Sequence, residues 1–175
     1  MFKHKKAVSA LVATVLLILI TVAAVGIIWG AIMPMITTSL NVGRECLNAR
    51  LTVNTQSGYT CIISTANQTQ VMISRGSEEF TPAGMQILAS GQGRTITISL
   101  NSTPNAFVRM IDGIYGGALQ IPNINEERTY VINTSGIAGN VNFVPTDVAV
   151  APVALVGRTQ RVCDATSTAP LIVCS

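Results

Sequence analysis

Hydrophobic and polar residues follow two different patterns along this chain, and the change falls near residue 45. Residues 7–36 form an apolar run of thirty residues without a charged side chain. At 1.5 Å per residue a helix of this length extends about 45 Å, whereas the hydrocarbon core of a bilayer is about 30 Å thick. The run therefore predicts a membrane-spanning helix that is longer than spanning requires.

After this run, short stretches of alternating polar and apolar residues predict β-strands. The clearest is 95–100, which places Ile96, Ile98 and Leu100 on one face. Further strands are predicted at 51–54, 70–74, 130–132, 141–144 and 148–150. Turn residues separate the strands, among them Pro82-Ala83-Gly84 and Gly91-Gln92-Gly93. Strands recurring at intervals of roughly 8–12 residues are typical of a β-sandwich.

Together the two patterns predict an α+β chain in which a long hydrophobic helix precedes an all-β, Ig-like sandwich. We expect three parts: a basic leader at 1–7, an apolar helix at 8–40, and an outer β-domain at 41–175. About 125 residues after the helix suffice for one hydrophobic core.

Four residues of the apolar run bear on its packing. Gly26 and Gly30 have the small-xxx-small spacing that lets membrane helices approach closely, although glycine is common in such helices anyway. Trp29 fits either an anchor at the outer membrane interface or a packing residue between subunits. Pro34 has no amide hydrogen to donate, so we expect a kink or break near 33–38.

Charge is scarce, at 11% of residues against about 25% in ordinary globular proteins. Lys3, Lys5 and Lys6 supply the whole net charge of +3, because eight arginines and eight acidic residues balance one another from Arg44 onward. A neutral body offers no basic surface for phosphates, so we expect no nucleic-acid partner. The basic head is expected to stay cytoplasmic while the remainder faces outward.

The start of the chain resembles a known family. Lys5-Lys6-Ala7-Val8-Ser9, followed by Val12-Ala13-Thr14-Val15-Leu16-Leu17-Ile18, is similar to the amino-terminal segment of archaeal type IV pilins and archaellins. The resemblance covers residues 3–36 and implies cleavage by a prepilin peptidase between Ala7 and Val8, after the basic Lys6. Ala10 stands where many members have proline. No glutamate lies near the mature start, unlike bacterial pilins, which favours the archaeal branch.

The resemblance implies a structural subunit of an extracellular type IV pilus-like filament, with the helix in the fibre core and the β-domain exposed. Its partners would be copies of itself, the prepilin peptidase, the pilus assembly machinery and, before assembly, the membrane. One alternative is a single-pass, membrane-anchored surface binding protein that does not polymerise. A minor pilin-like secretion component is a further alternative. An ordinary cleaved secretory signal fits less well, because its apolar region spans only about 7–15 residues.

Four cysteines, at 46, 61, 163 and 174, lie in the part expected outside the cell, where disulfides form. Their spacing favours local pairs, Cys46–Cys61 and Cys163–Cys174, although four cysteines allow three connectivities. Closely spaced CxxC or Cys/His pairs, which zinc sites use, do not occur. We therefore expect two disulfides, no metal and no cofactor.

Three glycosylation sequons begin at Asn67, Asn101 and Asn133. Each lies at a predicted turn or strand end, and the surrounding surface is poor in charge. The sequence predicts a glycoprotein on this basis.

Candidate catalytic groups are few. The only histidine, His4, lies in the leader, so the mature chain would have none for Ser/His or Cys/His chemistry. Glu78-Glu79 and Glu126-Glu127 are adjacent in sequence, which in a strand makes them point apart. We therefore expect a protein that is not an enzyme.

Overall fold

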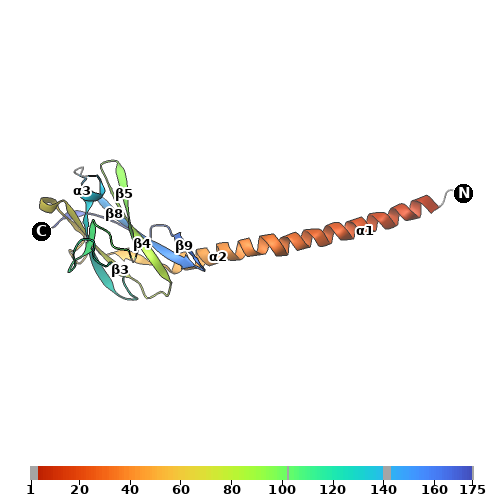
Figure 1. The fold of residues 1–175 in the computed structure, drawn as a ribbon, viewed down its shortest axis with the longest axis horizontal. Coiled ribbons are helices and arrows are strands. Elements are labelled where there is room, and N and C mark those ends of the chain that lie inside the picture. Colours follow the sequence, from red (N-terminus) through yellow and green to blue (C-terminus); the bar gives the residue numbers. More distant parts are fainter. Residues whose placement is uncertain (1–3, 102, 140–142, 175) are drawn as a thin grey trace. The chain divides into compact units, whose positions relative to one another are not determined.

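The computed structural model describes residues 4–101, 103–139 and 143–174, with side chains from Leu11 onward. The chain divides into two compact units, Met1–Val42 and Gly43–Ser175. In Figure 1 the first unit is the greater part of the red-to-orange helix, and the second unit is the β-rich domain. The predicted class, an apolar amino-terminal helix followed by an all-β sandwich, is confirmed.

Three helical segments follow one another without interruption: α1 (His4–Ile27), the π-helix η1 (Ile28–Ile32) and α2 (Met33–Asn48). The π segment has a chemical cause in Pro34, which donates no hydrogen bond and crowds the carbonyl one turn earlier. The Met33 amide reaches back five residues to the Ile28 carbonyl, which widens this turn. The chain stays helical through 33–38, so the irregularity lies one turn before the predicted kink or break.

The described part of the second unit contains eleven strands in two sheets. One sheet has the order β11-β2-β3-β7-β6, with β1 also beside β3, and the other has the order β10-β8-β4-β5, with β9 also beside β8. Paired strands are antiparallel except β11 and β2. The strands are β1 (Leu51–Val53), β2 (Cys61–Ile63), β3 (Gln68–Arg75), β4 (Pro82–Gly91), β5 (Arg94–Leu100), β6 (Val108–Met110), β7 (Glu127–Asn133), β8 (Asp147–Val156), β9 (Thr159–Val162), β10 (Ser167–Pro170) and β11 (Ile172–Val173). Two short helices, η2 (Ser64–Ala66) and α3 (Thr134–Ile137), lie between strands.

Alternation along the strands builds the core between the sheets. In β3 every second residue is buried, and in β5 Ile98 and Leu100 are buried while Ile96 is half-buried, as the period-two pattern predicted. The largest fully buried side chains come from both sheets and include Leu51, Ile73, Met85, Ile87 and Tyr130. The core therefore lies between the inner faces of the two sheets.

The turn between β4 and β5 agrees with the sequence. Gln92 and Gly93 have φ angles of 52° and 75°, and two successive positive φ values define the type I′ hairpin turn. Gly91 pairs with Arg94 directly below this turn. The Gly91-Gln92-Gly93 prediction is confirmed.

Other boundaries differ from the predicted ones. The helix continues to Asn48, beyond the predicted end at residue 40. Pro82-Ala83-Gly84, predicted as a turn, begins β4 and carries an irregularity in its pairing with β8. No strand is assigned to 143–144, and residues 141 and 142 of the predicted strand 141–144 lie outside the described residues.

Candidate functional site

The largest exposed feature is the apolar surface of the helix. The helix Leu11–Asn48 is long and apolar enough to span a membrane, because an 18-residue window within it has a mean hydropathy of 3.0 and none of that window is buried. Leu17, Ile20 and Trp29 are each about two-thirds exposed. A helix that is apolar on all sides is normally covered by lipid or by other protein. This surface therefore requires a partner that the chain itself does not provide.

Hydroxyl groups within this helix are satisfied locally. Thr14 donates to the Leu11 carbonyl at 2.9 Å, and Thr21 donates to the Ile18 carbonyl at 2.8 Å. The same back-bonding occurs in α2 at three successive residues, Thr37, Thr38 and Ser39. Because these donors have acceptors on their own helix, the surface can enter an apolar environment without unpaired hydroxyl hydrogens.

Gly26 and Gly30 have no role that the described residues explain. A Cβ atom built at either position would meet no described atom within 4 Å. Glycine in a helix interior costs about 1 kcal/mol relative to alanine in water. The described residues therefore leave open space beside both glycines.

Lys6, Ala7 and Val8 lie in the first turns of α1, which begins at His4. Their side chains lie outside the described part of the chain. The structure thus places the predicted cleavage residues on the helix and adds no test of the cut itself.

Two disulfides form, but their connectivity differs from the predicted local pairs. Cys46 bonds to Cys163 with a Cα–Cα distance of 5.4 Å, and Cys61 bonds to Cys174 with a Cα–Cα distance of 5.0 Å. The predicted Cys46–Cys61 and Cys163–Cys174 pairs are wrong. Spacing in sequence misled because the two ends of the domain converge in space, where β11 pairs with β2.

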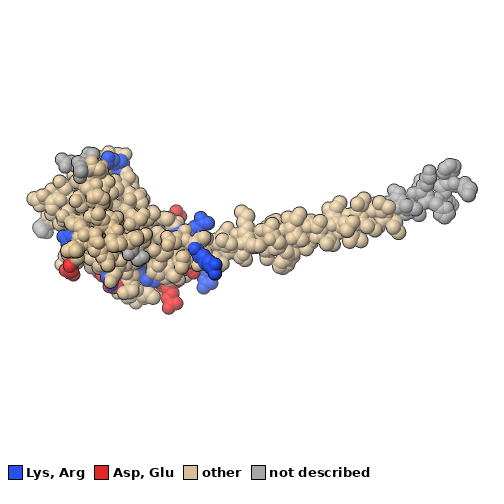
Figure 2. Space-filling view, viewed as in Figure 1, with Lys and Arg blue, Asp and Glu red and all other residues tan. Residues whose placement is uncertain are grey.

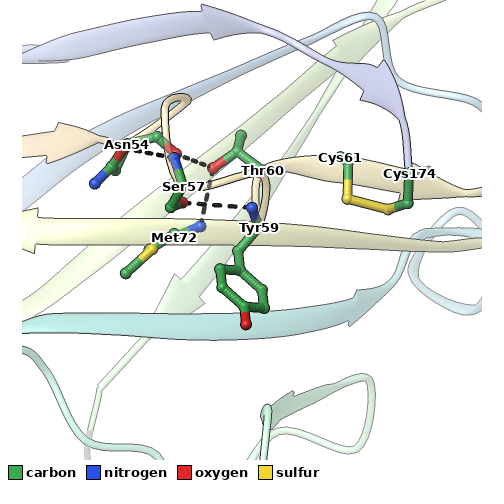
Figure 3. Close-up of a disulfide and its surroundings, with 7 residues drawn as sticks. All are labelled: Asn54, Ser57, Tyr59, Thr60, Cys61, Met72 and Cys174. Atoms are coloured by element: carbon green, nitrogen blue, oxygen red, sulfur yellow. Dashed lines mark hydrogen bonds between the residues drawn. A yellow bond between two sulfur atoms is a disulfide. The ribbon is translucent and has the colours of Figure 1, made fainter.

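Figure 3 shows how the chain before Cys61 is held. The Thr60 hydroxyl donates to the Asn54 carbonyl and accepts the Met72 amide at 3.2 Å. The Asn54 side chain accepts the Gln56 amide at 2.9 Å. These bonds fix the loop between β1 and β2, and with it the sulfur that meets Cys174.

The three sequon asparagines have different surroundings. Asn67 is exposed and ends η2 with a φ of 50°. Asn101 is exposed, and its side-chain oxygen accepts the Thr103 amide at 3.2 Å. Asn133 is half-buried, and its side-chain oxygen caps α3 by accepting the Gly136 amide at 2.9 Å. Because Asn133 is half-buried and its side chain is held in this cap, Asn67 and Asn101 are the sterically better candidates.

The acidic pairs do not converge on a common point. Glu126 forms an ion pair with Arg128 at 2.6 Å and accepts the Asn123 amide at 2.7 Å. The Asn123 amide, followed by Arg128, lowers the pKa of the Glu126 carboxyl. Glu127 accepts instead from the Asn54 side chain at 3.0 Å. Glu78 and Glu79 are exposed, and no group of three metal-ligating side chains occurs among the described residues.

Sequence reasoning missed the last two turns of α2, which carry Cys46 to its partner. The predicted helix ended at residue 40, although four of the exposed apolar residues of α2 keep a heptad-like spacing. These residues are Met33, Ile36, Leu40 and Leu47. That spacing was the available signal for the longer helix.

Comparison with protein-family models and with curated proteins finds no match for this chain.

Proposed function

We propose that this protein is the structural subunit of an extracellular filament of the type IV pilus kind. Its helix forms the fibre core and its β-domain forms the exposed surface. The subunit resides in the membrane before assembly and at the cell surface afterwards. Its partners are copies of itself, a prepilin peptidase and the assembly machinery, and it needs no cofactor.

The observation that carries this proposal is the excess length of the uncovered apolar helix. The apolar run at 7–36 comprises thirty residues, which extend about 45 Å as a helix, whereas a bilayer core of about 30 Å requires about 20 residues. The exposed residues Met33, Ile36, Leu40 and Leu47 continue the apolar surface beyond one bilayer thickness. A plain anchor has no use for this extra surface, whereas helices packed side by side in a fibre bury all of it.

Burial of this surface supplies a strong driving force for assembly. Full burial of a side chain such as Leu17 or Ile20 contributes roughly 1.5–3 kcal/mol. Once a subunit leaves the bilayer, only other helices can provide that burial. Gly26 and Gly30 allow close approach because no side chain projects from them.

Replacing Gly26 with glutamate tests the proposal. The variant places a charge in the packed core without a partner, which is costly, so we expect filaments to be lost from sheared cell-surface material under the electron microscope. Gly26→Ala leaves the core uncharged and should retain far more filament. Thr168→Glu, at an exposed position of β10, serves as the matched charge control and should assemble normally.

Membrane level is measured in the same cells, because glutamate at position 26 also weakens insertion. The decisive case is a Gly26→Glu subunit that reaches the membrane at the normal level. If that subunit still forms normal fibres, the helix is not the fibre core. If the unaltered protein forms no fibres, the proposed filament is wrong, and a membrane-anchored surface binding protein becomes the better hypothesis.

A further inference from the structure

Strand β5 lies at the edge of its sheet and presents a row of backbone groups to the outside. It is the last strand in the order β10-β8-β4-β5, so β4 pairs with one side of it only. A two-residue turn joins β4 to β5, and the residues that flank this turn, Gly91 and Arg94, form a hydrogen-bonded pair. Because such pairs alternate along antiparallel strands, the amide and carbonyl groups of Thr95, Thr97 and Ser99 point away from β4.

Two observations agree with this direction of the backbone groups. The Ser90 carbonyl, opposite Thr95, accepts the Thr146 amide at 2.7 Å and therefore points toward the β8 side of β4. Among the described residues, no backbone group outside the β4–β5 ladder bonds to Thr95, Thr97 or Ser99. All three residues are exposed. Their outward amide and carbonyl groups are thus available to a further strand.

β5 lacks the features that usually protect a sheet edge. Natural proteins shorten edge strands, or place charges, proline or bulges in them. The other outer strands follow this rule, because β1, β6 and β11 have only two or three residues, β9 carries Arg161 and β10 carries Pro170. In contrast, β5 has seven residues, a regular register and no charge after Arg94. In Figure 2 uncharged side chains, drawn in tan, cover most of the visible face of the β-domain.

The sequence of β5 is nearly the same when it is read in either direction. Its central part is Thr95-Ile96-Thr97-Ile98-Ser99. If two copies of β5 pair antiparallel with Thr97 opposite the partner's Thr97, then Thr95 lies opposite the partner's Ser99. The residues with outward backbone groups therefore face one another, and each of these groups gains a hydrogen-bond partner.

The side chains are compatible in the same register. Threonine and serine hydroxyls lie opposite one another on the outer face, and such pairs stabilise antiparallel sheets. On the inner face Ile96, which is half-buried within one chain, lies opposite the partner's Ile98 and extends the apolar core. Arg94 lies opposite the partner's Leu100, so no like charges meet within the ladder. The edge of β5 thus fits a second copy of itself.

We propose that β5 pairs antiparallel with β5 of a second copy, which joins their two sheets into one. The contact is isologous, with a two-fold axis at Thr97. A single strand pair is a small contact, so we expect a weak dimer that crosslinking can capture. The contact depends on the strand edge and not on the proposed filament. Within that filament, where all subunits point the same way, it would join subunits of two adjacent fibres.

Cysteine crosslinking of the full-length chain in detergent tests the contact and its register. The native cysteines are already paired, so an introduced thiol is the only free one. Opposed residues of a hydrogen-bonded antiparallel pair have Cα atoms about 5.5 Å apart, which is within disulfide range. Thr97→Cys should therefore give a disulfide-linked dimer on mild oxidation, with the bond mapped to position 97 of both chains. Thr168→Cys, at an exposed position of β10, controls for random collision.

The neighbouring positions make the test specific for register. Thr95→Cys alone and Ser99→Cys alone should not crosslink, because each thiol would lie about 14 Å along the strand from its own copy. The double variant Thr95→Cys with Ser99→Cys should crosslink, because its thiols lie opposite one another. Adding Thr97→Pro to this double variant removes an outward amide and leaves the β4–β5 ladder intact. We expect about tenfold less dimer, whereas Thr97→Ser in the same background should change nothing.

Peptide mapping of both native disulfides confirms that each variant has folded. A dimer yield of Thr97→Cys no higher than that of Thr168→Cys would overturn the pairing, and so would equal yields from Thr97→Pro and Thr97→Ser. Equal crosslinking by Thr95→Cys alone would exclude this register. Recovery of Thr97→Cys bonded to a different protein would show that the edge binds a foreign strand instead. Because detergent-solubilised subunits require no fibre, these outcomes are independent of the proposed function.

Discussion

At the scale of single residues, Arg75 is the least expected member of the core. Only 8% of the surface of Arg75 is exposed to solvent. Its guanidinium donates to the Phe80 carbonyl at 2.9 Å and the Pro122 carbonyl at 3.4 Å, and it lies 4.4 Å from the centre of the Phe80 ring. Burial lowers the pKa of this guanidinium. Arg75 thereby fastens two loops to the end of β3 through a cation that binds carbonyls and an aromatic face.

This geometry predicts an unusual order of stability for two substitutions. Arg75→Lys keeps the buried charge, but an ammonium cannot reproduce the planar set of donors or stack on Phe80 equally well. We expect it to lower the free energy of unfolding by roughly 2–3 kcal/mol. Arg75→Met removes the charge and keeps the aliphatic packing, so its loss should be smaller. Denaturant unfolding of the domain that begins at Gly43 measures the stability of both variants. An Arg75→Lys variant as stable as the parent would show that the guanidinium contacts do not stabilise the fold.

At the scale of elements, the sequence predicted strands where one face is buried and polar residues alternate. β5 and β3 satisfy this condition, and so does the hairpin turn at Gln92 and Gly93. β4 was not predicted. Pro82-Ala83-Gly84 was assigned to a turn because it carries turn residues, whereas the strand absorbs them through an irregular pairing. Local sequence contains no information on such long-range pairing.

The disulfides failed prediction for the same reason. Their partners are 117 and 113 residues apart in sequence, and only the paired sheets bring them together. Spacing favours short loops, but the domain uses its cysteines to join its beginning to its end.

The interleaved connectivity, in which each bond encloses one cysteine of the other bond, makes the two disulfides interdependent. A first bond closes a loop of more than a hundred residues, which the chain-entropy model values at roughly 5 kcal/mol. With that bond present, the second bond closes a shorter loop made of the tethers 46–61 and 163–174. This loop has roughly 26 residues, and its closure contributes about 3.5 kcal/mol to the free energy of unfolding. Replacing either cysteine pair by serine should therefore cost about 3.5 kcal/mol, and removing the remaining pair should cost roughly 5 more.

Denaturant unfolding of the two single-pair variants and of the four-serine variant measures this difference. A metal chelator added to the parent protein serves as a control, because bound metal would make stability depend on it. If the four-serine variant loses only the sum of the two single-pair losses, the tethers do not act as a short closed loop. Pairing of Cys46 with Cys61 in peptide maps under non-reducing conditions would contradict the connectivity itself.

At the scale of the whole molecule, charge and hydrophobicity are separated along the chain. Residues 1–7 carry every lysine, the helix carries no charge between Lys6 and Val42, and the eight arginines and eight acidic residues of the body balance. The basic head favours retention of the helix amino terminus on the cytoplasmic side of a membrane. The same head opposes withdrawal of the helix into a fibre, because lysines would have to cross or enter an apolar core.

We predict processing between Ala7 and Val8, which would resolve this conflict. The cut removes Lys3, His4, Lys5 and Lys6 and leaves an apolar helix whose only added charge is the new α-amino group. Mass spectrometry of the mature protein should find Val8 as the first residue. Ala7→Leu, which enlarges the residue before the cut, should leave the leader attached, keep the subunit in the membrane and prevent filaments. Phe2→Leu, a control within the leader, should be cut normally. A mature chain that begins at Met1, or after a cut beyond residue 22, would exclude the pilin-like route, because the first retains the lysines and the second removes half of the helix.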